Sequence, residues 1–198
     1  MPSDAGLIVL GGGCAGLSLA SHLCGYGKNI PRTLVLEQRA AYHNDRTWCF
    51  WDQKETVWEN SISKKWGSVV FANGDFTKNL DLHPYHYNKI QGLDFYNQVL
   101  NLIAKQKNID FVQEKVFEIE ESDSIVLVKT ESQSFSCTTL FNSIYNPSLA
   151  SNQTKYPLLQ QHFVGWFIKT VTPVFNPELA TFMDFSVEQK GNTRFMYI

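Results

Sequence analysis

The residues best suited to chemistry form a glycine-rich run near the start of the chain, with the pattern G-x-G-x-x-G over Gly11, Gly13 and Gly16. In a phosphate-binding turn of this kind, the first glycine lets a strand turn sharply into a helix, and the second leaves the backbone bare beside a pyrophosphate. The third lets the helix pack closely on the strand. The N–H groups of Cys14 and Ala15 would then face the phosphates at the positive end of the helix.

The elements around this run are those that a dinucleotide site requires. Residues 7–10 (LIVL) predict one strand buried on both faces, and residues 17–26 predict a helix. A second predicted strand, 34–36, ends in Glu37, which lies 21 positions after Gly16. An acid about 20 residues beyond the motif typically accepts hydrogen bonds from the adenosine ribose. The pattern therefore favours a site for FAD or NAD over a structural turn, and Glu37 disfavours the 2′-phosphate of NADP.

Length, charge and composition limit which other classes of function the chain can have. The chain has 198 residues, enough for one domain or somewhat more, and its net charge of −2 gives no footprint for nucleic acid. No uninterrupted apolar segment approaches about 18 residues, and no signal peptide is evident. The four cysteines form no C-x-x-C pair, so we expect reduced, mostly buried thiols in a cytoplasmic protein. The aromatic content of 14% indicates an aromatic core or an apolar ligand.

Residues 39–57 follow the ribose acid with many bulky rings and no clear periodicity, and we expect an ordered loop there. Arg46 is the candidate functional residue of this loop, as a cation near a phosphate or ribose. A surface arginine stacked on Trp48 is an equally good interpretation. His83 and His86 flank a proline without a Cys or carboxylate partner nearby, so we expect loop residues there and no metal site.

The remaining pattern predicts a helix at 93–105 and a hairpin at 66–82 that turns at Asn73-Gly74. Short strands are predicted at 109–111, 116–119, 125–129 and 140–145, and strand-like runs at 163–171, 180–187 and 193–198.

These elements predict a division of the chain into three parts. Residues 1–146 would form an FAD-binding, Rossmann-type domain with β insertions, and the polar stretch 147–157 is typical of a linker. Residues 158–198 would begin a substrate-binding β-sheet region. Its last run stops without a turn, so we expect that sheet to be incomplete at the C-terminus.

Several later stretches give the chain a family resemblance. Residues 45–51 (DRTWCFW) resemble the N-H-T-W-S-F-type segment of lycopene cyclases. Residues 161–166 (QHFVGW), 180–185 (ATFMDF) and 194–197 (RFMY) are similar to the Q-H-F-x-G-W, x-M-D-F and R-F-x-Y segments of the same enzymes, in the same order. The resemblance implies an N-terminal portion of the family. Its implied fold is α/β, Rossmann-like and FAD-binding, with an additional, mainly antiparallel β-sheet region for the substrate.

The resemblance also implies a flavoprotein of carotenoid synthesis that closes the linear ends of lycopene, or of a related carotenoid, into β-ionone rings. In the implied isomerisation an acid protonates a terminal double bond, the carbocation cyclises and a proton leaves. FAD is required in its reduced form without net electron transfer, and NAD(P)H keeps it reduced. Because the substrate is a hydrocarbon of the bilayer, we expect the cytoplasmic protein to attach peripherally to the membrane.

Two departures from the family pattern bear on the chemistry. Asn142 and Ile144 stand where the family usually carries Asp and Arg, at an expected flavin-side contact. The glutamate implied as the catalytic acid would follow Ile198, so we expect residues 1–198 alone not to cyclise lycopene. Asp184 is the remaining candidate acid, although a structural hydrogen-bonding role is the favoured interpretation.

Two other functions stay open. One is another FAD enzyme, of the hydroxylase or geranylgeranyl-reductase type, which would consume NAD(P)H stoichiometrically. The other is a non-catalytic FAD- or carotenoid-binding fragment. The mass of the product separates the enzymes, because cyclisation leaves the mass of the hydrocarbon unchanged.

Overall fold

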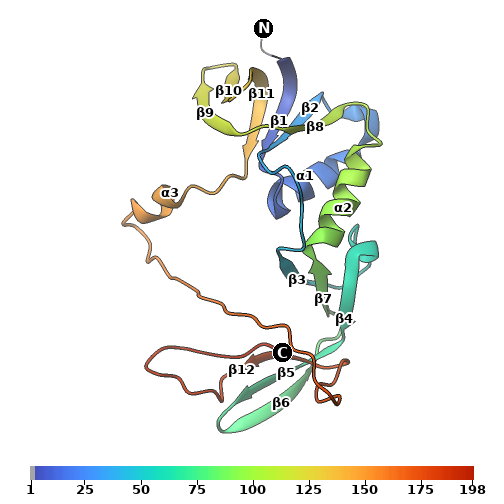
Figure 1. Cartoon of the computed structure of the whole chain (residues 1–198), viewed down its shortest axis with the longest axis vertical. Coiled ribbons are helices and arrows are strands. Elements are labelled where there is room, and N and C mark those ends of the chain that lie inside the picture. Colours follow the sequence, from blue (N-terminus) through green and yellow to red (C-terminus); the bar gives the residue numbers. More distant parts are fainter. Residues whose placement is uncertain (1–2) are drawn as a thin grey trace. The chain divides into compact units, whose positions relative to one another are not determined.

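The computed structural model describes residues 3–198, and all side chains in that range except those of residues 3, 4, 149 and 150. The chain divides into two compact units (Figure 1). Unit 1 comprises Met1–Asp45 and Leu93–Gln160, and unit 2 comprises Arg46–Gly92 and Gln161–Ile198.

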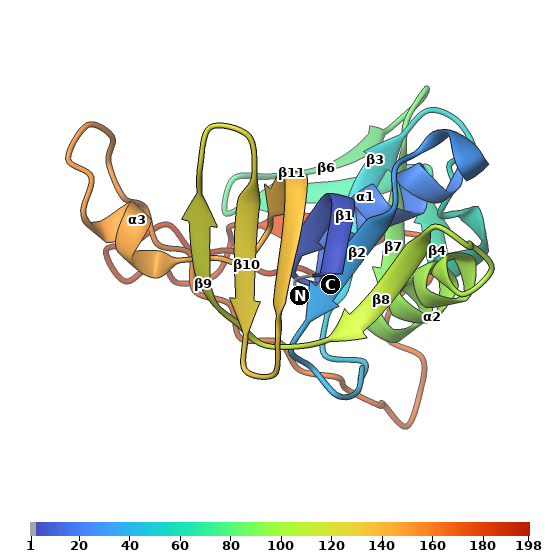
Figure 2. The ribbon, with the colours of Figure 1, turned by 90° about the horizontal axis from the view of Figure 1, so that it is seen from above.

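Unit 1 is built on a six-stranded sheet in the order β8-β2-β1-β11-β10-β9 (Figure 2). The parallel strands are β1 (Ser3–Leu10), β2 (Thr33–Glu37), β8 (Ile109–Gln113) and β11 (Ser134–Asn142). The antiparallel strands β9 (Val116–Glu121) and β10 (Val126–Thr130) extend the sheet from β11 as a meander. The parallel strands follow the order 3-2-1-4 of a dinucleotide-binding fold, in which ligands bind at the carboxyl ends where the order reverses. Here that point lies between β1 and β11.

Two helices flank these strands in sequence. α1 (Cys14–Cys24) connects β1 to β2, and α2 (Gly92–Ile103) precedes β8. Leu17 of α1 and Val99 of α2 are completely buried. The helix predicted at 17–26 begins earlier in the structure, at Cys14. The glycine loop runs directly into this helix, and the prediction missed the first turn because Gly16 lowers its helix propensity. The helix predicted at 93–105 agrees with α2 to within two residues at each end.

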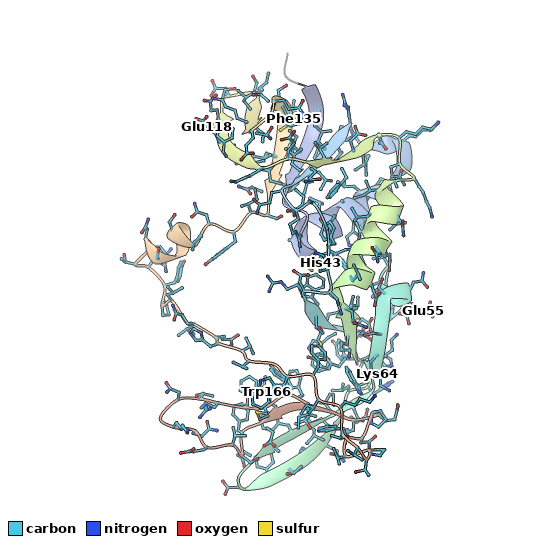
Figure 3. The ribbon with its side chains drawn as sticks, in the orientation of Figure 1. His43, Glu55, Lys64, Glu118, Phe135 and Trp166 are labelled. Carbon is cyan, nitrogen blue, oxygen red and sulfur yellow. The ribbon has the colours of Figure 1, made fainter. Side chains whose placement is uncertain are left out.

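The apolar run at the start of the chain forms the centre of the core, as the sequence predicted. Ile8, Val9 and Leu10 of β1 are completely buried. Successive side chains of a strand point to opposite faces, so both faces of β1 are covered. Ile8 and Leu10 belong to an apolar cluster that also contains Val128 of β10 and Phe135 of β11. Phe135 is labelled in Figure 3.

Unit 2 contains two three-stranded sheets. One has the order β3-β7-β4, with β3 (Thr47–Asp52), β4 (Ile62–Trp66) and β7 (His86–Gln91) all antiparallel. The other has the order β12-β5-β6, with β5 (Ser68–Asn73) and β6 (Phe76–Asp81) as an antiparallel hairpin and β12 (Ala180–Asp184) parallel to β5. The predicted hairpin is confirmed, but its turn lies one residue later than the predicted Asn73-Gly74, because Asn73 pairs with Phe76. Its turn is Gly74-Asp75, and the Asn73 Oδ1 accepts hydrogen bonds from the N–H groups of Asp75 and Phe76 at 2.8 and 3.2 Å.

The structure corrects the predicted linear division at residues 146 and 158. Residues 46–92 group with 161–198 and not with the glycine-loop unit. The reason is the pairing of β12 with β5, which joins segments far apart in the sequence. The predicted linker also contains a short helix, α3 (Pro147–Ser151), and the Asn146 side chain caps this helix by accepting from Ser148 N–H.

Three local predictions are also corrected. Residues 39–57 contain β3, whose alternation was hidden because rings lie on both of its faces. Residues 163–171 form no strand, and the Phe167 and Val171 side chains extend fully into solvent. Residues 193–198 form no strand, although Met196 bridges Asp184 and Ile198 exchanges backbone hydrogen bonds with Thr181.

The cysteines are less buried than predicted. All four are free thiols, but Cys137 alone is fully buried, whereas Cys14 and Cys49 are exposed. Cys14 is exposed because it opens α1 directly after the glycine loop. Two 3-10 turns, Gly27–Asn29 and Glu59–Ser61, complete the assigned helices of the described chain. No helix in that part of the chain is long and apolar enough to cross a bilayer.

Candidate functional site

The three motif glycines occupy positions that explain their residue type. Gly11 has φ of 92°, a left-handed conformation that glycine adopts without strain, and its N–H donates to Leu36 at 2.8 Å. A Cβ on Gly16 would lie 1.9 Å from the Gly11 carbonyl oxygen, so helix and loop pack as closely as glycine permits. A Cβ on Gly13 would meet nothing within 4 Å. Gly13 therefore faces the open side of the loop, where the motif places a pyrophosphate.

The start of α1 at this loop has the features of an anion site. Gly13 is the N-cap residue, and no side chain caps the helix. The first N–H groups of a helix lack intrahelical acceptors and carry the positive end of its dipole. These groups include the N–H groups of Cys14 and Ala15, which the sequence predicted as ligands. Whether they bind phosphate stays a prediction.

Glu37 lies beside the same loop at the end of β2. Its carboxylate is 7% exposed. Oε2 accepts from Gly12 N–H at 2.7 Å and from Arg39 Nη2 at 3.2 Å, and Oε1 accepts from Arg39 N–H at 2.9 Å. Burial alone would raise the pKa of Glu37, but the hydrogen bonds from Arg39 and Gly12 prevail and lower it. The residue is thus a carboxylate, with acceptor capacity left on Oε1 for a ribose hydroxyl.

Gly12 is a site residue that sequence reasoning missed. A Cβ there would lie 2.3 Å from the Tyr42 hydroxyl and 2.9 Å from Glu37 Oε2. The Gly12 carbonyl accepts from Arg39 Nη2 at 2.7 Å and from Tyr42 OH at 2.8 Å. The G-x-G-x-x-G pattern leaves this position unspecified, so the only sequence signal was that Gly12 completes a run of three glycines.

Arg39 and Tyr42 were also missed, since both fell in the segment predicted as an aperiodic loop. The Arg39 guanidinium lies over the Tyr42 ring at 4.4 Å and over the Tyr96 ring at 5.3 Å. Tyr96, on α2, donates to Asp45 Oδ1 at 3.1 Å. Burial and the charge of Glu37 raise the pKa of Tyr42, so its hydroxyl remains a donor at neutral pH.

The residues at and just after the end of β11 contact the end of β1 and the start of the glycine loop. Ser143 N–H and Oγ donate to the Leu10 carbonyl at 2.9 and 2.6 Å, and Oγ also lies 3.3 Å from the Gly11 carbonyl. Asn142 Oδ1 accepts from Ile144 N–H at 2.9 Å. In this chain the stretch 142–144, which departs from the family pattern, thus ties the ends of β1 and β11 together at the point where the strand order reverses.

An open pocket of about 470 Å³ lies near the carboxyl ends of β2 and β8. It is lined by Gln38, Arg39, Gln113, Glu114, Lys115 and Glu131. Arg39 therefore has one side on the glycine loop and another on this pocket. Among the described side chains, no group of three or more His, Cys, Asp or Glu residues is arranged to hold a metal ion.

Two predicted site residues belong to unit 2. Arg46 belongs to unit 2, where its carbonyl accepts from Gly92 N–H at 2.7 Å, so its predicted role at the nucleotide stays a prediction. Asp184, also in unit 2, accepts hydrogen bonds from the N–H group at 2.9 Å and the hydroxyl of Ser186. The Ser186 hydrogen bonds lower the pKa of Asp184. A general acid works best with a pKa near the working pH, so this environment favours an anchoring role.

Solved structures with a similar fold include monooxygenases and a hydroxylase. A p-nitrophenol 4-monooxygenase from Pseudomonas putida DLL-E4 matches with a TM-score of 0.58 and 19% identity over 72% of this chain and 41% of the other. A probable FAD-dependent monooxygenase from Pseudomonas aeruginosa gives 0.56 and 12%, over 69% and 41%. An anhydrotetracycline hydroxylase from Streptomyces rimosus gives 0.54 and 18%, over 70% and 31%. Unit 1 thus has the Rossmann-like fold of FAD-dependent monooxygenases, and the chain spans less than half the length of these three structures.

Sequence comparison identifies the family directly. Comparison with curated proteins gives no significant match. The family model described as lycopene cyclase protein matches residues 6–198, which include the glycine loop, the β3 segment and the three later motifs. The match extends over almost the whole sequence and over both units. The chain therefore belongs to the lycopene cyclase protein family.

Proposed function

We propose that unit 1 binds FAD, with the pyrophosphate at Gly11, Gly13 and Gly16 and the N–H groups that open α1. The observation that carries this proposal is the cradle at Gly13, where a Cβ would meet no protein atom within 4 Å although Gly12 and Gly16 on either side are tightly enclosed. The uncapped helix start supplies donors to that space. Glu37 would accept a hydrogen bond from the adenosine ribose.

We further propose that the protein acts in cyclisation of lycopene or a related linear carotenoid to β-ionone rings, with NAD(P)H as the reductant. Membership of the family supports this activity. Bound in its reduced form, FAD would supply negative charge beside a carbocation. The protein's own part is to bind the nucleotide, exclude water and offer ring faces to the cation.

The aromatic cluster of unit 2 suits the last of these roles. Trp51 and Tyr87 of the β3-β7-β4 sheet have ring centroids 4.6 Å apart, and Phe182 of β12 meets both rings edge-on at 5.4 and 5.3 Å. Tyr197 continues the cluster at 6.0 Å from Phe182. Trp51 and Tyr197 remain about half exposed. We propose this cluster as part of the surface that holds the polyene.

Peripheral attachment to the membrane is a separate proposal. The stretch between α3 and β12 exposes many apolar side chains, including Phe163, Val164, Trp166, Phe167 and Ile168. Trp166 is labelled on this extended segment in Figure 3. Such side chains can enter the interfacial region of a bilayer. Co-sedimentation with liposomes tests the proposal, and complete recovery of the protein in the supernatant would contradict it.

Thiol labelling tests FAD binding with an internal control. Cys14 is exposed beside the glycine loop, and Cys49 is exposed in unit 2. We expect saturating FAD to slow maleimide labelling of Cys14 and to leave that of Cys49 unchanged. Although Cys14 is exposed, its thiol is partly shielded from water, which raises its pKa, so the rates are best compared at mildly alkaline pH. Equal Cys14 rates with and without FAD would contradict the assignment.

Because the fold resembles that of monooxygenases, an oxidoreductase activity, of the hydroxylase or reductase type, is the alternative. A hydroxylase would add oxygen and a reductase would add hydrogen, whereas a cyclase leaves the mass of the carotenoid unchanged. Mass spectrometry of pigments extracted from lycopene-accumulating cells that express the protein separates these outcomes, and unaltered lycopene would agree with the expectation that residues 1–198 alone do not cyclise it. A product heavier than lycopene would replace the cyclase proposal with an oxidoreductase.

A further inference from the structure

The peptide plane between Gly12 and Gly13 has an unusual set of restraints. Its carbonyl oxygen accepts two hydrogen bonds, from Arg39 Nη2 at 2.7 Å and Tyr42 OH at 2.8 Å. The plane before it is fixed as well, because Gly12 N–H donates to Glu37 Oε2 at 2.7 Å. Three side chains, Glu37 at the end of β2 and Arg39 and Tyr42 just after it, therefore hold a backbone segment that has no side chain of its own.

The planarity of the peptide gives this restraint a direction. The Gly12–Gly13 bond is trans, so the Gly12 C=O and the Gly13 N–H point to opposite sides of the chain. With the carbonyl turned toward Arg39 and Tyr42, the N–H is turned away from them. It lies on the amino side of the residue whose Cβ position is open. The clamp thus aims one more donor toward the anion site.

Without the clamp this peptide would rotate easily. Both of its flanking residues are glycines, which lack the Cβ that restricts the backbone elsewhere. A flipped peptide would present the carbonyl oxygen where the N–H had been, and an oxygen repels a pyrophosphate. Gly12 itself fits this account, because a Cβ there would displace the Tyr42 hydroxyl.

Arg39 is held for this task from several sides. It lies over the rings of Tyr42 and Tyr96, whose centroids are 4.4 Å apart. It pairs with Glu37 Oε2 at 3.2 Å, and its Nη1 lies 3.9 Å from Asp45 Oδ2. The planar guanidinium can donate hydrogen bonds to the Gly12 carbonyl and to the Glu37 carboxylate at the same time, a geometry that a lysine ammonium reproduces poorly.

We propose that Arg39 and Tyr42 are positioning residues that lock the Gly12–Gly13 peptide so that Gly13 N–H points at the pyrophosphate of the bound nucleotide. The inference rests on the proposed function of unit 1 and adds two residues that no glycine motif specifies. It predicts that the two side chains act on the phosphate part of the ligand through the backbone, without touching the ligand.

Two variants test the lock in the full chain, with FAD affinity measured from quenching of flavin fluorescence. Arg39→Met is expected to raise the Kd for FAD about 10- to 100-fold, because it removes a charge-assisted hydrogen bond from the carbonyl. Tyr42→Phe removes a single neutral hydrogen bond and should raise it about 3- to 10-fold. Arg39→Lys should recover part of the loss.

Tyr26→Phe is the matched control. It removes the hydroxyl of an exposed tyrosine of unit 1 that lies outside the cluster around Arg39. Its Kd should stay within about twofold of the unchanged protein, because both hydrogen bonds to the Gly12 carbonyl are kept. Urea unfolding of each apo variant shows whether a change in Kd is separate from a change in stability.

A second readout distinguishes positioning from general stability. Tyr42→Phe should weaken binding of ADP, which carries the pyrophosphate, and leave binding of adenosine unchanged, as measured by saturation-transfer NMR. Equal losses for both ligands, or Kd values for Arg39→Met and Tyr42→Phe within twofold of the unchanged protein, would overturn the lock alone. Absence of FAD binding by the unchanged protein would overturn the proposed function as well. If Arg39→Met fails to fold, Tyr42→Phe carries the test.

Discussion

The glycine loop of unit 1 and the segment before β12 in unit 2 differ in how many of their side chains and backbone groups are buried or hydrogen-bonded within the protein. Around the loop, Gly12, Glu37 and Arg39 find partners within 40 residues of sequence, and the carboxylate is buried. In the segment 161–179, no strand forms and Trp166 is 82% exposed. Both stretches carry family motifs. A motif whose partners are local is therefore complete within the described chain, whereas for one rich in exposed rings we propose a further surface, that of a carotenoid or a membrane.

The comparison predicts that a change in the loop's packing has the largest effect. Gly16→Ala would place a Cβ 1.9 Å from the Gly11 carbonyl oxygen. Because the obstacle is backbone, we expect a loss of about 3 kcal/mol in the free energy of unfolding. Urea denaturation followed by circular dichroism measures it. An unchanged denaturation midpoint would mean that the loop is looser than its contacts indicate.

Removal of the ribose acid should have the next largest effect. Glu37→Ala deletes the acceptor of Gly12 N–H and the partner of Arg39. We expect FAD binding to weaken by about 1–3 kcal/mol, as for lost hydrogen bonds to a charged group. Calorimetric titration with FAD gives the value, and Asp110→Ala, an exposed carboxylate on β8 paired with Arg32, serves as the control. Equal affinities of the two variants would remove Glu37 from the site.

The ionisation of Glu37 makes part of the free energy of unfolding depend on pH. Its pKa is lowered in the folded protein, so its contribution to the free energy of unfolding is present above the unfolded pKa of about 4.3 and is lost as the pH falls through the lowered value. The stability difference between the unchanged protein and Glu37→Gln should therefore shrink between pH 5 and pH 3. A difference that stays constant over this range would contradict the ionised, hydrogen-bonded carboxylate.

The smallest effect on stability is expected in the exposed segment. Trp166→Ser should alter the free energy of unfolding by less than about 0.5 kcal/mol, as at other surface positions. Liposome binding should decrease all the same, if the exposed rings enter the interface. A large loss of stability would show that Trp166 is packed in solution, and would remove the contrast between the two regions.

Sequence reasoning succeeded where a few neighbouring residues determine the structure. The strand before Gly11, both helices and the hairpin after Asn73 follow from local periodicity and turn chemistry. The Rossmann-like fold follows from the glycine motif in its strand–helix context and from the family resemblance. The family also follows from sequence, because the motif segments are specific and occur in order.

What the sequence did not predict depends on long-range pairing. The grouping of residues 46–92 with 161–198 arises from β12 pairing with β5, and no local pattern encodes that pairing. Arg39 and Tyr42 acquire their role only when the end of β2 meets the Gly12 carbonyl. The rings of β3 lie on both faces, so they concealed its period of two.

FAD titration of the unchanged protein beside Gly13→Val tests the central claim most directly. A Cβ at Gly13 meets no protein atom within 4 Å, so the variant should fold with an unchanged urea midpoint while its side chain fills the pyrophosphate position. We predict quenching of flavin fluorescence by the unchanged protein and none by Gly13→Val. A Gly13→Val protein that binds FAD as tightly as the unchanged chain would contradict the assignment of this loop as the cofactor site.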